Sequence, residues 1–188
     1  MTKPQDYWVR HEHGTDRIAP DEARTLQRLP VYAVLDHIRS AHNVGAAFRT
    51  SDGAGIGELL LCGYTPCPPH RHLSKTAFGA VEVVPWQHCE TTQDALDIVR
   101  ARGCQILALE FNERSVPLWE FDLKFPLALV FGNEVEGLSE ATMERCDAVV
   151  HLPMRGLKNS LNVSVAFGIT AYEVLRRYEL QQQSQKNE

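Results

Sequence analysis

The chain has 188 residues, 44% of them hydrophobic, and a formal net charge of −5. This length and apolar content suit one domain with a substantial core, and the acidic balance excludes a generally basic nucleic-acid binder while leaving room for a local basic patch. A polar N-terminus, the lack of an apolar run of membrane length and five scattered cysteines predict a cytoplasmic protein with reduced thiols and no membrane partner.

The first thirty residues are polar and of mixed charge, and we expect a peripheral arm there, with a helix over 22–29 capped by Asp21. After Pro30, short apolar runs alternate with helical segments. Strands are expected at Val31–Leu35, Leu59–Cys62, Val81–Val84, Ile106–Leu109, Leu127–Phe131 and Ala148–Leu152. Helices are expected at Asn43–Ser51, Asp94–Arg102, Ser139–Arg145 and Leu161–Tyr178.

This alternation predicts an α/β fold with a mainly parallel sheet, because the strands are apolar throughout, as in a sheet covered by helices on both faces. We expect an arm over 1–30, one domain over 31–180 and a fraying polar tail over 181–188.

The last helix has two apolar faces. One holds Leu161, Val165, Gly168, Tyr172 and Leu175, and the other holds Val163, Phe167, Val174 and Tyr178. A second subunit and full burial in its own domain explain the second face equally well.

The segment Asn43-Val44-Gly45-Ala46-Ala47-Phe48-Arg49 follows the first strand. In a helix, Gly45 and Arg49 lie one turn apart on one face, so the glycine leaves room for a ligand or a backbone above the arginine. Arg49 would then lie near the carboxyl end of a strand, where open α/β sheets bind ligands. On spacing alone, an N-capping Asn43 and a surface arginine are the simpler interpretation.

Two later segments have the same strand–loop–helix form. Phe131-Gly132-Asn133-Glu134-Val135-Glu136-Gly137-Leu138-Ser139 places two glycines and two carboxylates after a strand, and the glycines allow close backbone approach. In the segment 151–164, a basic loop with Arg155 and Lys158 precedes a helix whose first-turn amides attract anions. Each pattern alone also fits ordinary capping.

Two other patterns are weaker. Gly53-Ala54-Gly55-Ile56-Gly57 follows a helix and precedes a strand, which is the reverse of the order in a dinucleotide-binding loop. Cys62, Cys67, His70 and His72 offer zinc ligands, but their spacing does not match that of common zinc sites. We therefore expect no metal.

Taken in order, the three segments resemble the TrmH (SpoU) family of RNA ribose 2′-O-methyltransferases, of the SPOUT superfamily. The resemblance runs from about Val31 to Arg177 and includes Lys75-Thr76-Ala77-Phe78-Gly79-Ala80. It implies a C-terminal trefoil knot, a homodimer, S-adenosylmethionine as the cofactor, and tRNA or rRNA as the substrate. The alternative is a non-catalytic RNA-binding module on the same fold.

The resemblance also assigns residues. The implied cofactor contacts are Leu109, Gly132, Leu152, Met154 and Leu161. The implied catalytic polar residues are Asn43, Arg49, Glu134, Ser160 and Asn162. Many relatives have an acidic residue or Gln where Lys158-Asn159 precedes Ser160. We expect no separate RNA-binding domain before the catalytic part, so RNA contacts are expected from the arm, the dimer and a basic patch, for which the candidates are Arg39, Arg71, Lys75, Arg155 and Lys158.

An arginine is often described as the general base in this family, but an Arg pKa above about 12 makes that role difficult. We therefore interpret Arg49 as a clamp on an RNA phosphate that also stabilises developing alkoxide charge. Ser160 and Asn162 would orient the ribose and the loops.

Overall fold

The computed structural model describes residues 19–186. Most of the expected N-terminal arm therefore lies outside the described residues. Its described part contains α2 (Pro20–Arg24), a shorter helix than the one expected over 22–29. None of the helices in residues 19–186 has the length and apolar character to span a membrane.

Seven strands form one sheet in the order β3-β2-β1-β6-β4-β7-β5, and every strand pair is parallel. The strands are β1 (Val31–Asp36), β2 (Glu58–Cys62), β3 (Trp86–Cys89), β4 (Gln105–Leu109), β5 (Val116–Pro117), β6 (Leu127–Phe131) and β7 (Ala148–His151). The helices are α3 (Ala41–Ala54), α4 (Arg71–Ala77), α5 (Thr92–Ala101), α6 (Glu140–Met143) and α7 (Val163–Lys186), with short 3-10 turns η1 (Ala80–Glu82) and η2 (Leu118–Glu120). The parallel α/β fold is confirmed, and the trefoil knot stays a prediction.

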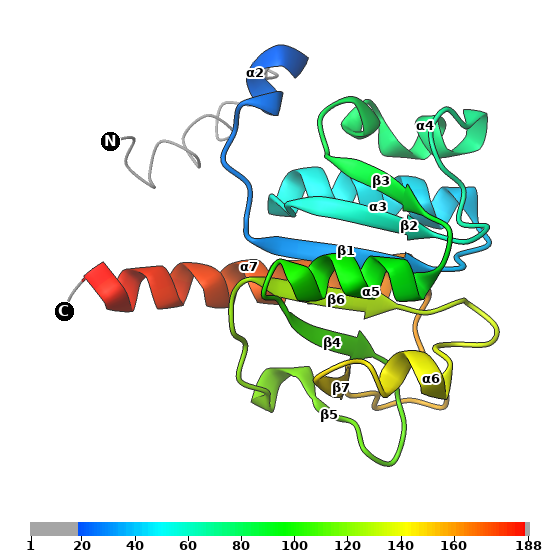
Figure 1. Ribbon diagram of the computed structural model, residues 1–188, viewed down its shortest axis with the longest axis vertical. Coiled ribbons are helices and arrows are strands. Elements are labelled where there is room, and N and C mark those ends of the chain that lie inside the picture. The colour runs from blue at the N-terminus through cyan, green and yellow to red at the C-terminus, as the bar shows by residue number, and fades with distance from the viewer. Residues whose placement is uncertain (1–18, 187–188) are drawn as a thin grey trace.

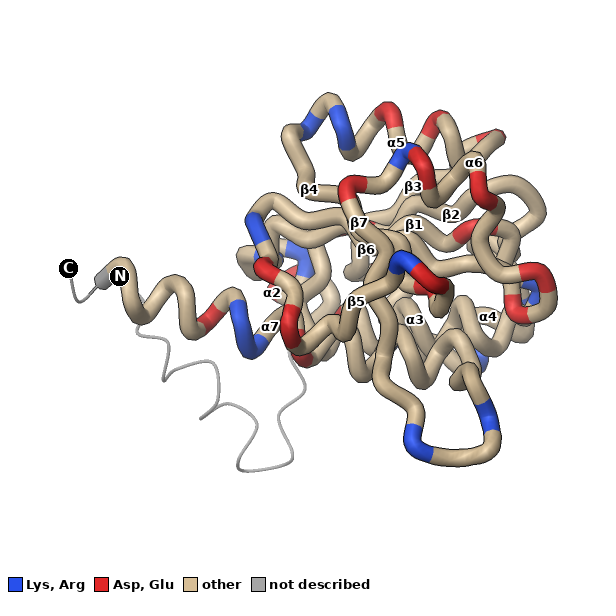
Figure 2. The backbone as a smooth tube through the Cα atoms, turned by 90° about the horizontal axis from the view of Figure 1, so that it is seen from below, with Lys and Arg blue, Asp and Glu red and all other residues tan. Residues whose placement is uncertain are grey.

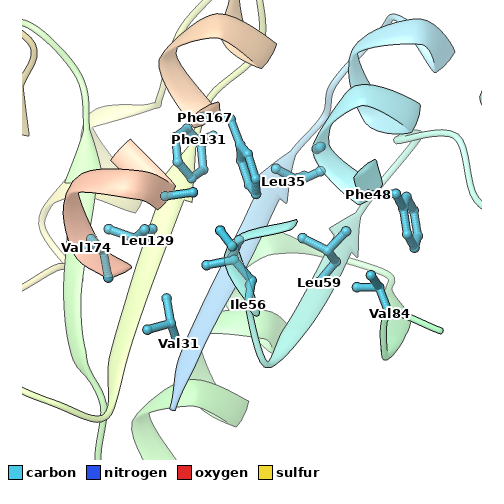
Figure 3. Close-up of a cluster of buried hydrophobic side chains, with 14 of the residues drawn as sticks. Val31, Leu35, Phe48, Ile56, Leu59, Val84, Leu129, Phe131, Phe167 and Val174 are labelled. Carbon is cyan, nitrogen blue, oxygen red and sulfur yellow. The ribbon is translucent and has the colours of Figure 1, made fainter. Parts of the chain in front are cut away.

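Helices cover both faces of the sheet, with α3 and α7 behind it and α5 in front in Figure 1. Phe48 of α3 and Phe167 and Val174 of α7 belong to the buried cluster on one face. Figure 3 shows Phe167 and Val174 directed toward Phe131 and Leu129 of β6. On the opposite face of the sheet, the apolar residues of α5 form a second buried cluster with the side chains that the strands direct to that face. The central strands are thus apolar throughout because both their faces are buried.

Three expectations need correction. Val81–Val84 is not a strand, since η1 occupies its first half and β3 begins after Pro85. Helix α4 was not expected. The last helix begins at Val163 and continues to Lys186, so it ends beyond Tyr178, where its end was expected. In its last turns Gln181 Nε2 donates to the carbonyl oxygen of Leu123 at 3.0 Å.

Candidate active site

Three loops that leave the carboxyl ends of β4, β6 and β7 enclose a pocket of about 890 Å³. Open α/β sheets bind ligands at this edge, where the neighbouring strands end together. All five expected cofactor contacts line the pocket, namely Leu109, Gly132, Leu152, Met154 and Leu161. Three of the five expected catalytic residues line it too: Glu134, Ser160 and Asn162. The pocket thus has apolar walls with a few convergent polar groups, as small-molecule sites do.

The loop after β6 is shaped by its glycines and by Asn133. A Cβ atom added to Gly132 would lie 2.5 Å from the carbonyl carbon of Gly137 and 2.7 Å from the nitrogen of Leu138. Gly132 is therefore required because the loop folds back on itself, which is the close backbone approach expected of a glycine here. The buried Asn133 accepts from the backbone N–H groups of Val135 and Glu136 through Oδ1. Its side chain holds the loop in a fixed turn.

Glu134 joins this loop to the start of α3. Its carboxylate accepts from the backbone N–H of Arg39 at 2.9 Å, from the backbone N–H of Ser40 at 3.2 Å and from Nδ2 of Asn43 at 2.8 Å. Burial raises the pKa of this carboxyl, but the hydrogen bonds outweigh burial and the net pKa is lowered. Glu134 is therefore ionised at neutral pH and a poor proton acceptor, so its geometry suits an anchor rather than a general base.

Asn43 links the first and third segments. It lies in the first turn of α3, where its own N–H donates to the capping Ser40 Oγ at 3.3 Å. Its Oδ1 accepts from Nδ2 of Asn162 at 3.2 Å. Asn162 in turn caps α7, because its Oδ1 accepts from the backbone N–H of Ser164 at 2.8 Å. One chain of hydrogen bonds thus runs from Glu134 through Asn43 to Asn162, and three segments far apart in sequence meet there.

Arg49 does not belong to this chain of hydrogen bonds and does not line the pocket. Its guanidinium lies over the ring of Phe78, 4.8 Å from the ring centroid. The space at Gly45 is filled by a backbone, since a Cβ atom there would lie 2.5 Å from the carbonyl oxygen of Leu73 in α4. Of the two possibilities raised by the sequence, a ligand or a backbone above Gly45, the structure shows the backbone.

The residues expected to contact RNA have no ion-pair partner within residues 19–186. Paired arginines are common away from the site: Arg24, Arg28, Arg100, Arg102, Arg114, Arg145, Arg176 and Arg177. None of the expected RNA contacts, Arg39, Arg71, Lys75, Arg155 and Lys158, forms such a pair, and of these only Lys158 lines the pocket. In Figure 2 acidic and basic positions are mixed along α5, whereas one projecting loop has basic positions only. Positive charge is thus available locally despite the acidic total.

Three polar residues beside the site were not expected from the sequence, namely Asp36, His37 and Tyr64. Asn133 Nδ2 donates to the carbonyl oxygen of His37 and to the Tyr64 hydroxyl, both at 2.7 Å. His37 Nδ1 lies 2.6 Å from Oδ1 of the buried Asp36, which also accepts from Thr92. Asp36 ends β1, so an acidic residue at the carboxyl end of an apolar run was the available signal. Tyr64 had no such signal, because only the tertiary fold brings it to Asn133.

Zinc binding finds no support in residues 19–186, where no group of three or more His, Cys, Asp or Glu side chains is arranged to hold a metal ion. Cys62 is fully buried in β2, and burial is the main cause that raises the pKa of its thiol. A metal ligand must be the thiolate, which this environment disfavours.

A parallel α/β sheet with a large pocket built by loops at the carboxyl ends of its strands defines a ligand-binding protein of the open α/β class. The model of the SpoU rRNA Methylase family matches residues 30–172, and the chain belongs to this family. It is 35% identical to the 23S rRNA (guanosine-2′-O-)-methyltransferase RlmB of Pseudomonas aeruginosa, over 79% of this chain and 60% of that protein. The chain therefore spans about three fifths of the length of this curated relative.

Two solved structures are similar. The AdoMet-bound rRNA methyltransferase from Sinorhizobium meliloti superposes with a TM-score of 0.74 at 30% identity, covering 87% of this chain and 62% of that one. The TrmH/SpoU tRNA modifying enzyme of A. aeolicus superposes with a TM-score of 0.77 at 30% identity, covering 87% of this chain and 84% of that one. The family resemblance drawn from the three segments is thereby confirmed.

Proposed function

We propose that the chain is an S-adenosylmethionine-dependent methyltransferase that methylates a ribose 2′-hydroxyl of tRNA or rRNA. The observation that carries this proposal is the meeting of Asn43, Glu134 and Asn162 at the rim of a pocket lined by every expected cofactor contact. The similar proteins named above, an AdoMet-bound rRNA methyltransferase and a tRNA modifying enzyme, support the same activity.

The pocket fits such a cofactor. Its volume of about 890 Å³ lies within the range of about 300–1,000 Å³ usual for ligand sites. Leu109, Leu152 and Leu161 offer apolar contacts, and Ser160 lines the pocket with no hydrogen-bond partner in the described chain. These residues would hold the cofactor, whose sulfonium supplies an electrophilic methyl group when bound.

The remaining steps belong to residues of this chain. Ser160 and Asn162 would orient the ribose, and alignment of reacting groups alone can lower a barrier by about 7–11 kcal/mol. Arg49, unpaired and exposed, would hold an RNA phosphate and stabilise charge that develops on the ribose oxygen. The ribose proton would leave through phosphate or water, because the lowered pKa of Glu134 makes it a weak base.

The test is transfer of a tritiated methyl group from S-adenosylmethionine to unmodified tRNA and rRNA, followed by nucleoside mapping. We expect a 2′-O-methylated nucleoside, which protects the following phosphodiester from alkaline cleavage because the 2′-oxygen can no longer attack it. Cofactor binding without transfer to either RNA would contradict the proposal and favour a non-catalytic RNA-binding module.

We also propose a homodimer that packs through one face of α7, within a protein of the reducing cytoplasm, where its five free cysteines would persist. Phe167 and Val174 face the core, whereas the opposite face leaves a half-exposed apolar stripe of Leu161, Val165, Ile169 and Tyr172. A contiguous apolar stripe of this kind is typical of a subunit interface.

We expect Val165→Glu to shift the sedimenting mass from two chains to one, because a charge at the centre of the stripe would lose its hydration in the interface. Analytical ultracentrifugation at micromolar concentration measures this. The matched control is Trp119→Glu, at a site of similar exposure beside β5, which should remain dimeric. A monomeric wild-type protein would contradict the dimer.

A further inference from the structure

Phe78 has a backbone conformation that bulky side chains rarely adopt. It follows the last residue of α4 with φ 51° and ψ 43°, in the left-handed region that usually takes glycine or asparagine after a helix. His37 and Phe78 are the only non-glycine residues with positive φ in residues 19–186, and a bulky side chain there is the greater outlier. The side chain of Phe78 is 75% exposed, so apolar burial does not offset the strain. Such outliers concentrate at functional sites.

The surroundings of Phe78 are cationic. The Arg49 guanidinium lies 4.8 Å from the centroid of the ring. Within residues 19–186, Arg49 has no hydrogen bond and no ion pair, and Arg71 and Lys75 of α4 are equally unpaired and exposed. Helix α4 has no acidic residue. Phe78 is thus an exposed ring in contact with one unpaired cation, and the short helix that precedes it has two more.

This arrangement is fixed by the packing of α3 against α4. Gly45 lets the two helices approach until the carbonyl oxygen of Leu73 is within 2.5 Å of where a Cβ would be. Leu73 itself is fully buried. Figure 1 shows α3 between α4 and α7. Phe78 and Arg49 are both exposed, so the ring and the guanidinium face solvent beside this packed pair of helices.

An exposed ring beside free cations suits single-stranded nucleic acid, in which every base has an aromatic face and every linkage is an anion. We propose that Phe78 stacks on a base of the RNA substrate, while Arg49, Arg71 and Lys75 hold the adjoining phosphates. The proposal rests on the proposed function, to which it adds a base contact. Arg49 is six residues from Asn43 along α3, about 9 Å of helix. The stacked base would thus belong to a neighbour of the methylated nucleotide.

The test uses the full chain and two fluorescent probes, a short single-stranded oligoadenylate and an abasic oligonucleotide of equal length. We expect the wild-type protein to bind the oligoadenylate about tenfold more tightly, which is the usual effect of one stacked base. Phe78→Gly should remove this preference and leave abasic binding nearly unchanged, whereas Phe78→Trp should keep it. The double substitution Arg71→Ala with Lys75→Ala should weaken both probes alike.

Equal binding of both probes by the wild-type protein, or an unchanged preference in Phe78→Gly, would overturn the proposal. So would a smaller sedimenting mass for Phe78→Gly, because the ring would then cover a second copy. Glycine adopts the left-handed conformation freely, so the melting midpoint should not fall. If it falls, Phe78→Asn serves instead, since asparagine tolerates the same conformation. Absent methyl transfer with an intact base preference would refute the proposed function alone.

Discussion

Arg49→Ala should reduce methyl transfer by about 10²–10³-fold, because one preorganised charge-stabilising donor is lost. Cofactor affinity, measured by calorimetry, should stay nearly unchanged, since Arg49 does not line the pocket. Arg100→Ala is the matched control, because Arg100 is an exposed arginine of α5 that pairs with Asp147 at 2.7 Å. This control should retain activity.

Arg49→Lys separates a clamp from a simple charge. Lysine keeps the positive charge but lacks the planar fork that binds a phosphate with two parallel hydrogen bonds, so turnover should stay low. Near-normal turnover in Arg49→Lys would contradict the clamp. Loss of cofactor binding in Arg49→Ala would contradict its assignment to the RNA side.

Gly132→Ala should abolish measurable cofactor binding, because its new methyl group would overlap the backbone of Gly137 and Leu138. The loop must then open, and overpacking of this kind usually costs about 1–3 kcal/mol of stability. We expect a melting midpoint lower by several degrees and a calorimetric titration without heat.

Gly156→Ala is the control for this prediction. Gly156 lies in the loop after β7, where an added Cβ atom would meet nothing within 4 Å. Binding and stability should be unchanged there. Normal affinity in Gly132→Ala would show that the loop after β6 tolerates displacement, and the assignment of Gly132 to the cofactor site would fail.

The sequence predicts the interior of the sheet well and its edges poorly. Val31–Leu35 and Leu127–Phe131 were recognisable because strands buried on both faces leave no polar positions. Strand β3 was misplaced onto Val81–Val84, since this edge strand pairs on one side only and contains the polar Gln87 and His88. Helix α4 was missed because a short segment with five polar residues in seven has little apolar periodicity.

The site was predictable only where its residues are contiguous. The loops around Gly132 and Ser160 were foreseen, since a glycine-rich or basic turn after a strand is a local pattern. The hydrogen bond from Asn43 to Glu134 spans 91 residues, so only the tertiary fold determines it. Likewise, no local pattern indicates that Tyr64 reaches Asn133, or that Arg49 lies over Phe78.

The position of β6 beside β1 has a consequence for how the protein folds. Val31–Leu35 pairs with Leu127–Phe131, so the central pair of the sheet cannot form until most of the chain has left the ribosome. Until then β1 has an open edge and an uncovered apolar face, both of which favour aggregation. Contacts between such distant segments also slow folding. We expect refolding on a timescale of seconds or longer, with β1 and β6 gaining amide protection together in pulsed hydrogen exchange.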